Sequence, residues 1–231
     1  MIAPLSRRRG KEQGSWPAQR GGIPGGLYLA DRMRSKPKRE IEIKLRAGDV
    51  TAIIGKLRRI RAASGGRVHE RNTLYDTPDS YFRRTGRLLR VRIETPAASG
   101  AIKAGRGQAV VTFKAPAPVE RNTRYKEKLE TETAIRRPER WKEALRSLGF
   151  RSGFEYEKYR SAYRLRGLHI CLDETPVGTF LELEGQPQAI DRAARRLGYA
   201  PSEYIRGTYW DLYAAECKRR GKNPTNMLFR A

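Results

Sequence analysis

The sequence predicts a mainly β protein of the α+β class, in which eight antiparallel strands close into a barrel (a tunnel) and helices pack outside. Two observations carry this prediction. Eight strand-like segments follow one another between residues 38 and 185, and in several of them charged side chains alternate with apolar ones. Successive side chains of a strand point to opposite faces, so each of these segments has a charged face and an apolar face. Charged faces that meet inside a closed barrel explain the repetition.

Turn residues separate the expected strands. Thr77-Pro78-Asp79, Arg166-Gly167 and Pro176-Val177-Gly178 are typical turn sequences, and the Gly- and Ala-rich residues 96–107 form an expected loop. The eight strand segments are residues 38–45, 67–76, 86–94, 108–115, 124–134, 154–165, 167–173 and 179–185. A closed antiparallel barrel accommodates all of them.

Four helices are expected around the strands. Asp49 is the predicted N-cap of a helix over residues 49–63, which has apolar residues at helical spacing and stops at Gly65-Gly66. A second helix runs from Pro138 to Gly149 and is expected to bury three apolar side chains, Trp141, Leu145 and Leu148.

The other two helices lie toward the C-terminus. One spans about residues 187–197 and ends at Gly198. Thr208 and Asp211 resemble a capping box, which predicts that a terminal helix begins there.

Much of the positive charge lies at the two ends of the chain. The net charge is +24, and residues 1–36 are basic and rich in Gly and Pro, so we expect them to be a disordered extension. Residues 216–231 form a basic C-terminal tail, which leaves residues 37–215 as the folded domain. Both ends are suited at most to weak, nonspecific contact with nucleic acid. Since Met33 precedes the first strand, the sequence leaves open whether residues 1–32 belong to the native protein.

Several classes of protein are disfavoured. Cys171 and Cys217 lie far apart in sequence, which argues against a disulfide framework and for a reducing, cytoplasmic location. No apolar run approaches the ~20 residues of a membrane span. His69 and His169 are the only histidines, so a zinc site or a Ser-His-Asp triad has little support, and no P-loop sequence occurs.

Three segments place pairs of carboxylates on one face of a strand, roughly 7 Å apart. The pairs are Glu40 with Glu42, Glu130 with Glu132, and Glu182 with Glu184. Basic residues alternate in the same way in Arg90-Val91-Arg92, Thr112-Phe113-Lys114 and Lys158-Tyr159-Arg160. One such segment alone is typical of a solvent-exposed strand face, but the recurrence indicates a charged lumen that binds a charged ligand.

The order of these motifs resembles the CYTH superfamily, the triphosphate tunnel metalloenzymes, and in particular the branch of class IV adenylate cyclases and thiamine triphosphatases. Glu40-Ile41-Glu42-Ile43-Lys44 matches the ExExK motif of that superfamily, and the resemblance continues over residues 38–213. The further matching segments are Asn72 to Pro78, Gly86 to Arg92, Thr112 to Lys114, Leu129 to Glu132, Glu157 to Arg160, Leu172 to Glu174 and Gly178 to Gly185.

The resemblance implies a metal-dependent enzyme that acts on a triphosphate or a nucleoside triphosphate with Mg²⁺ or Mn²⁺, either by cyclising ATP or by hydrolysis. It implies a phosphate-binding set of Lys44, Arg90, Arg92, Lys114, Lys126, Lys158 and Arg160. It implies a metal-side set of Glu40, Glu42, Glu130, Glu132, Glu182, Glu184 and Asp173. Within these sets, the catalytic residues are expected to be Glu42, Lys44 and Glu182.

Some alternatives stay open at this stage. Lys128 is a weaker phosphate-binding candidate, and Glu94 is read as an exposed strand end. A non-catalytic protein that binds polyphosphate or an RNA 5′-triphosphate would need the same basic residues but not three carboxylate pairs. The sequence does not decide between cyclase and triphosphatase, or between a monomer and a homodimer.

Overall fold

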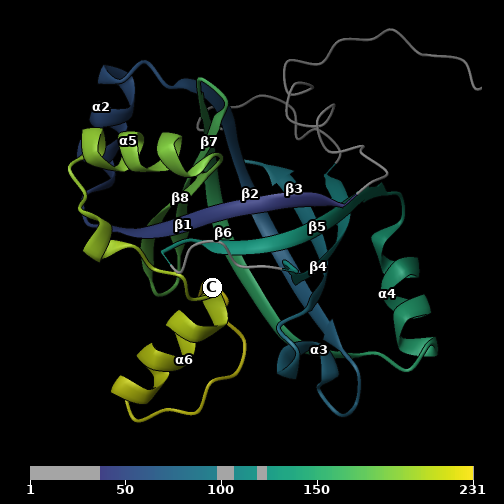
Figure 1. The fold of residues 1–231 in the computed structure, drawn as a ribbon. Coiled ribbons are helices and arrows are strands. Elements are labelled where there is room, and N and C mark those ends of the chain that lie inside the picture. The colour runs from purple at the N-terminus through teal and green to yellow at the C-terminus, as the bar shows by residue number, and fades with distance from the viewer. Residues whose placement is uncertain (1–36, 98–106, 119–123, 231) are drawn as a thin grey trace, which may run out of the picture.

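The fold is a closed antiparallel barrel, as the sequence predicts. The computed structural model describes residues 37–97, 107–118 and 124–230. Its strands close in the order β1-β5-β4-β3-β2-β6-β7-β8 (Figure 1). They are β1 (Lys38–Ala47), β2 (Ala63–Asp76), β3 (Leu88–Pro96), β4 (Gln108–Pro116), β5 (Lys126–Ile135), β6 (Arg151–Leu165), β7 (Leu168–Thr175) and β8 (Gly178–Glu184). The predicted extension over residues 1–36 and most of the predicted 96–107 loop lie outside the described residues.

The register of β1 shows how the strands sort their side chains. Glu42 pairs with Lys126 of β5 and with Glu184 of β8, and Lys44 pairs with Glu182. These side chains line the interior cavity, whereas the intervening Ile43 of β1 is buried in the apolar core outside the barrel. The barrel therefore has its charged face inside and its main hydrophobic core outside.

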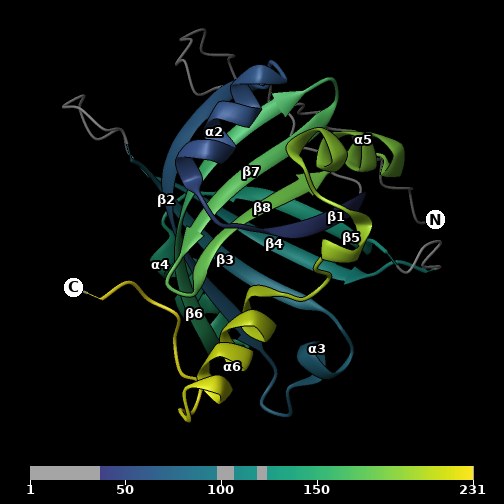
Figure 2. The ribbon, with the colours of Figure 1, turned by 90° about the vertical axis from the view of Figure 1, so that its left-hand side faces the viewer.

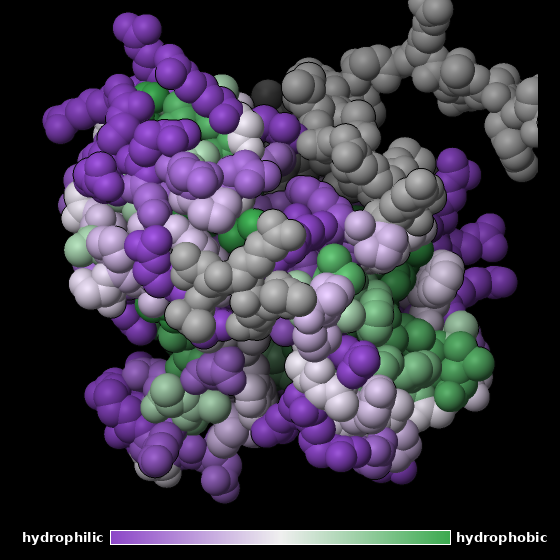
Figure 3. Space-filling view, in the orientation of Figure 1, coloured by the Kyte–Doolittle hydropathy of each residue, from purple (hydrophilic) through white to green (hydrophobic). Residues whose placement is uncertain are grey.

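That main core lies beneath two helices, α2 (Val50–Arg59) and α5 (Pro187–Leu197), which pack together over β1, β7 and β8 (Figure 2). Asp49 caps α2 by accepting hydrogen bonds from the backbone N–H groups of Thr51 and Ala52. The helix is shorter than predicted, because the chain turns at Arg61 in the left-handed region and β2 begins at Ala63. The outward face of this helical pair is mostly hydrophilic (Figure 3).

The helix α4 (Pro138–Ser147) corrects one prediction. Of the three side chains expected to be buried, only Leu145 is, while Trp141 is 45% exposed and Leu148 is 74% exposed. The helix reaches the barrel mainly at Leu145, which packs against Tyr75 and Val91, so the ends of its apolar stripe face solvent. Hydrophobic residues accordingly show at the surface near α4 (Figure 3).

Two short elements were not predicted from the sequence, the helix α3 (Tyr81–Arg84) and the 3₁₀ turn Pro201–Glu203. The first follows directly after the predicted Thr77-Pro78-Asp79 turn, and the Asp76 carboxylate holds its start by accepting from the backbone N–H groups of Phe82 and Arg83. The helices α3 and α6 (Tyr209–Arg219) lie at the same end of the barrel in both ribbon views (Figures 1 and 2).

The C-terminal region is anchored to the barrel. The predicted capping box of Thr208 and Asp211 starts α6, and the domain boundary predicted at residue 215 falls within this helix. Met227 is 1% exposed and forms a parallel bridge with Tyr156 of β6. The tail therefore closes back over β6. Within the described residues, no helix is both long enough and apolar enough to cross a membrane.

Candidate active site

The barrel encloses a cavity of about 880 Å³ whose wall is charged. This volume lies in the range of ligand-binding pockets. Every predicted phosphate-binding residue lines it: Lys44, Arg90, Arg92, Lys114, Lys126, Lys158 and Arg160. The three predicted carboxylate pairs line it as well: Glu40, Glu42, Glu130, Glu132, Glu182 and Glu184. The structure thus gathers into one cavity residues that lie far apart in the sequence.

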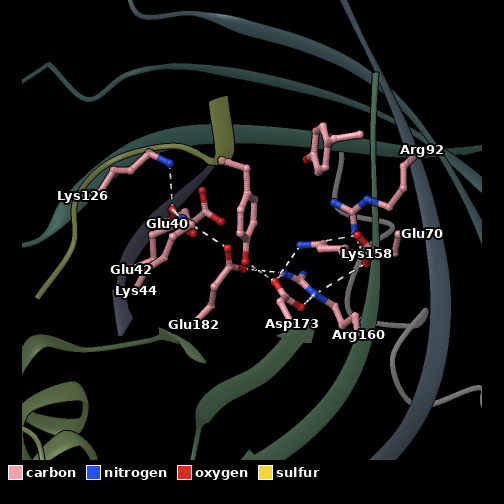
Figure 4. A network of polar contacts seen from close by, with 12 residues as sticks. Glu40, Glu42, Lys44, Glu70, Arg92, Lys126, Lys158, Arg160, Asp173 and Glu182 are labelled. Carbon is pink, nitrogen blue, oxygen red and sulfur yellow. Dashed lines mark hydrogen bonds and ion pairs between the residues drawn. The ribbon is translucent and has the colours of Figure 1, made fainter. Parts of the chain in front are cut away.

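One side of the cavity is a lysine–glutamate cluster formed by Glu40, Glu42, Lys44, Lys114, Lys126 and Glu130. Glu42 Oε1 accepts from Lys126 Nζ at 2.8 Å and from Lys44 Nζ at 3.0 Å. Lys114 Nζ donates to Glu40 Oε2 at 2.5 Å and lies 3.1 Å from Glu130 Oε1. Each of these lysines thus lies against at least one glutamate, and Figure 4 shows Lys126 and Lys44 beside Glu42.

The pKa values of the two glutamates of the ExExK motif are shifted in opposite directions. Burial raises the pKa of Glu40 to about 8, with Glu42, Glu130 and Glu184 adding to the effect and only Lys114 strongly opposing it. Burial also acts to raise the pKa of Glu42, but Lys126 and Lys44 outweigh it and hold that pKa well below its ordinary value. Glu42 is therefore the more readily ionised of the two, because two lysines contact its carboxylate whereas only Lys114 contacts that of Glu40 in the described residues.

The other side is an arginine cluster formed by Glu70, Arg92, Lys158, Arg160 and Asp173. Asp173 is fully buried and accepts from Arg160 Nε at 2.7 Å, from Lys158 Nζ at 2.8 Å and from the hydroxyl of Tyr209 at 2.6 Å. Its oxygen atoms are directed at these groups, and it does not line the cavity. In the structure described here, Asp173 orients basic residues, whereas the sequence placed it on the metal side.

Glu182 connects the two clusters. Its Oε1 lies 3.2 Å from Lys44 Nζ, and its Oε2 accepts from Arg160 Nη2. Although burial acts to raise its pKa, Lys44, Lys158 and Arg160 hold that pKa well below the ordinary value. Glu182 is therefore an ionised carboxylate midway along the cavity (Figure 4).

The remaining predicted residues occupy the rim and the wall. Arg90 Nη2 donates to Glu132 Oε1 at 3.4 Å and to Thr112 Oγ1 at 3.1 Å. Glu184 accepts from Lys38 Nζ at 2.8 Å. Lys128, the weaker candidate, lines the cavity and donates to the carbonyl oxygen of Gly86 at 3.1 Å.

Two acidic residues were missed or misread in the sequence. Glu94 is only 8% exposed and accepts from Arg92 Nη1 at 3.1 Å, so the expectation of an exposed strand end is wrong. Glu70 was not predicted, although it contacts three of the predicted cations. It is flanked by His69 and Arg71, so no alternation with apolar residues reveals which way it faces.

One end of the cavity is an aromatic mouth formed by Phe82, Phe154 and Trp210, which belong to α3, β6 and α6. The rings of Phe154 and Trp210 are in edge contact at 4.9 Å between centroids. The guanidinium of Arg83 lies over the Trp210 ring at 5.2 Å. An apolar platform beside a charged cavity suits a ligand with a flat heterocycle at one end and phosphates at the other.

The carboxylates have the chemistry that a hard divalent cation requires. Such ions take oxygen ligands, and Mg²⁺ commonly binds one or two carboxylates together with waters and phosphate oxygens. In the described residues, no three His, Cys, Asp or Glu side chains come together closely enough to hold an ion by themselves. Glu40, Glu42 and Glu182 line the cavity and could supply one or two of the carboxylates that such an ion takes.

The chain belongs to the CYTH family. Residues 38–209 match the CYTH domain, which is most of the chain and includes all eight strands. This agrees with the family that the motif order resembles.

Individual proteins resemble this chain in sequence or in structure. A protein of Methanocaldococcus jannaschii named "Putative adenylate cyclase MJ0240" is 25% identical over 146 residues, which span 63% of this chain and 75% of that protein. The structure of the PH1819 protein from Pyrococcus horikoshii is similar with a TM-score of 0.63 and 26% identity, over 77% of this chain and 99% of that one. A Hippeastrum protein, described as a putative adenylyl cyclase with a dominant triphosphatase activity, shares the fold with a TM-score of 0.51 and 18% identity, over 80% of this chain and 97% of that one.

Proposed function

We propose that the protein is a metal-dependent enzyme that acts on the triphosphate group of a nucleoside triphosphate or a related organic triphosphate. The observation that carries this proposal is the cavity wall, where all seven predicted phosphate-binding residues and all six predicted glutamates face one space. A triphosphate carries about four negative charges, and Arg and Lys side chains neutralise such charges through charge-assisted hydrogen bonds. The glutamates among these basic residues are suited to a cation that accompanies the substrate.

The basic residues bind and orient the phosphates. Arg92 and Arg160 have planar guanidinium groups that can donate to two phosphate oxygens at once. The lysines at positions 44, 114 and 158 act as point charges. Each of these cations is held by a carboxylate before substrate arrives. Little reorganisation is then needed on binding, which favours catalysis by preorganised charges.

The glutamates would hold the cation and activate the attacking group. Mg²⁺ or Mn²⁺ at Glu40, Glu42 and Glu182 would neutralise developing charge and polarise the phosphorus. Glu42 and Glu182, whose pKa values are held low, are ionised near neutral pH and can accept a hydrogen bond from an attacking hydroxyl or water. Lys44, between them, is positioned to stabilise negative charge on a phosphate oxygen.

Two reactions suit this site. Attack by water on the terminal phosphorus hydrolyses the triphosphate and releases phosphate, whereas attack by the ribose 3′-hydroxyl on the α-phosphorus releases pyrophosphate and forms a cyclic nucleotide. The aromatic mouth supports a substrate with a base, and the name of the Methanocaldococcus relative supports cyclisation. The Hippeastrum protein of this fold is described as a putative adenylyl cyclase with a dominant triphosphatase activity, so hydrolysis is tested beside cyclisation.

A substrate panel tests the proposal. The purified protein is incubated with ATP, tripolyphosphate or thiamine triphosphate, with Mg²⁺, with Mn²⁺ or with EDTA, and phosphate, pyrophosphate and cyclic AMP are separated. We expect turnover of at least one substrate that stops in EDTA. Tight binding of tripolyphosphate without turnover of any of the three would instead make the protein a polyphosphate-binding protein.

A further inference from the structure

The strand β2 supplies none of the predicted site residues, yet its Glu70 lies at the centre of the arginine cluster. Glu70 Oε1 lies 3.3 Å from Arg92 Nη1 and 3.6 Å from Arg160 Nε. Glu70 Oε2 lies 3.6 Å from Lys158 Nζ. One carboxylate thus faces three cations that come from β3 and β6, the strands on either side of β2 (Figure 4).

These contacts are remote from solvent. The Glu70 side chain is fully buried, and the side chains of Arg92 and Lys158 are 4% and 2% exposed. Glu70 does not line the cavity, whereas all three cations do. A substrate in the cavity would therefore meet the cations and not the carboxylate behind them.

The cations need this carboxylate, because like charges repel strongly where water is excluded. Burial and the neighbouring Arg160 act to lower the pKa of Lys158, and Asp173, Glu70 and Glu182 raise it again. Among the groups that raise the pKa of Arg92, Glu70 has the largest effect. Asp173 contacts Lys158 and Arg160, whereas Glu70 contacts Arg92 as well as those two, so Glu70 is the group that ties Arg92 to the other two.

We propose that Glu70 is a positioning residue, which fixes Arg92, Lys158 and Arg160 in one array shaped to receive the oxygens of a triphosphate. This inference rests on the proposed function, because it concerns how the same site holds its substrate. It goes further in assigning a role to β2: the strand carries the buried counter-charge that orients the phosphate-binding groups of its two neighbours.

A role of Glu70 in charge balance alone predicts a different effect of its removal on polyanion binding. If Glu70 only offset positive charge, its removal would leave the cavity more positive and bind a polyanion more tightly. If Glu70 positions the cations, even a variant that keeps the charge but shortens the side chain should bind less well. Glu70→Asp and Glu70→Gln together separate the two roles.

The experiment compares these variants with the wild type and with Glu127→Gln. Glu127 is a matched control, because it is 2% exposed and pairs with Arg39 on the outer face of the barrel. Tripolyphosphate binding is measured by calorimetry with Mg²⁺, KM and kcat are measured for the best substrate of the panel, and melting temperatures report folding. Both Glu70 variants should weaken tripolyphosphate binding by about tenfold or more and raise KM more than they lower kcat. Glu127→Gln should lower the melting temperature and leave binding unchanged.

Wild-type binding by Glu70→Asp, or tighter binding by Glu70→Gln, would overturn the proposal. A measurement on the unaltered protein covers the case in which the variants do not fold. In spectra of protein labelled with ¹⁵N-arginine, positioned side chains give resolved, slowly exchanging Nε–H signals for Arg92 and Arg160 before ligand is added. Averaged signals in the empty protein would contradict the proposal. If the wild type binds tripolyphosphate but turns over nothing, the proposed enzyme function fails while the role of Glu70 in binding is still tested.

Discussion

Replacing Glu42 with glutamine should destabilise the protein as well as remove its activity. Glu42 is 6% exposed, and its carboxylate accepts from Lys126 and Lys44. Glutamine keeps the shape but leaves Lys126 without that partner, whereas Lys44 retains Glu182. Breaking a buried ion pair from one side costs 3–5 kcal/mol, and since one lysine stays paired we take the lower end, about 3 kcal/mol.

The assay is thermal unfolding as a function of pH. For a protein of this size, about 3 kcal/mol corresponds to a fall in melting temperature of roughly 6–12 °C. Because the pKa of Glu42 is held below its ordinary 4.5, its ion pairs stabilise the fold above that pH and lose their effect as the pH falls through the lowered pKa. The difference between wild type and variant should therefore be full at pH 7 and shrink in acid.

Activity provides the second readout. With Mg²⁺ present, Glu42→Gln should lower kcat at least 100-fold, because a neutral amide neither balances a divalent cation nor accepts a proton. A variant that melts with the wild type at pH 7 would show that Glu42 is not ion-paired in solution. A variant with full activity would refute its place at the metal.

Three further predictions concern other parts of the structure. The pKa of Glu40 is raised to about 8, so its ionisation destabilises the fold as the pH rises from 4.5 to 8. The melting temperature of Glu40→Gln should therefore rise relative to that of the wild type across this pH range but not below it. An equal difference in melting temperature at pH 4 and pH 8.5 would contradict this. Met227→Ala should lower the free energy of unfolding, measured with denaturant, by about 2–4 kcal/mol, because it removes the buried side chain that holds the C-terminal tail on the barrel. An unchanged denaturation midpoint would show that the tail is not bound. Asp49→Ala should cost about 1 kcal/mol through loss of the α2 cap, whereas Asp49→Asn, which keeps an acceptor, should restore most of it.

The sequence was most informative where charged and apolar residues alternate. From Glu40 to Arg46 of β1 and throughout β8, every charged residue has an apolar neighbour, so the side that faces the interior follows from the period of the strand. All predicted phosphate-binding residues and all three glutamate pairs line the cavity for this reason.

The sequence was least informative where the direction in which a side chain points depends on how the strands pair in the closed barrel. Glu70 lies in the mostly polar segment Arg67-Val68-His69-Glu70-Arg71-Asn72. Only the pairing of β2 with β3 and β6 shows that its side chain faces the interior. Asp173 belongs to a predicted strand, but its partners come from β6 and α6. Likewise, the helical spacing of Trp141 and Leu148 indicates an apolar stripe but not how closely α4 approaches the sheet.

The most direct test is a crystal structure of the protein with Mn²⁺ and a non-hydrolysable ATP analogue. We predict triphosphate density inside the barrel in contact with Arg92, Lys158 and Arg160, and an anomalous manganese peak between that density and Glu40, Glu42 or Glu182. An analogue bound on the outer face, or manganese bound away from these glutamates, would contradict the account.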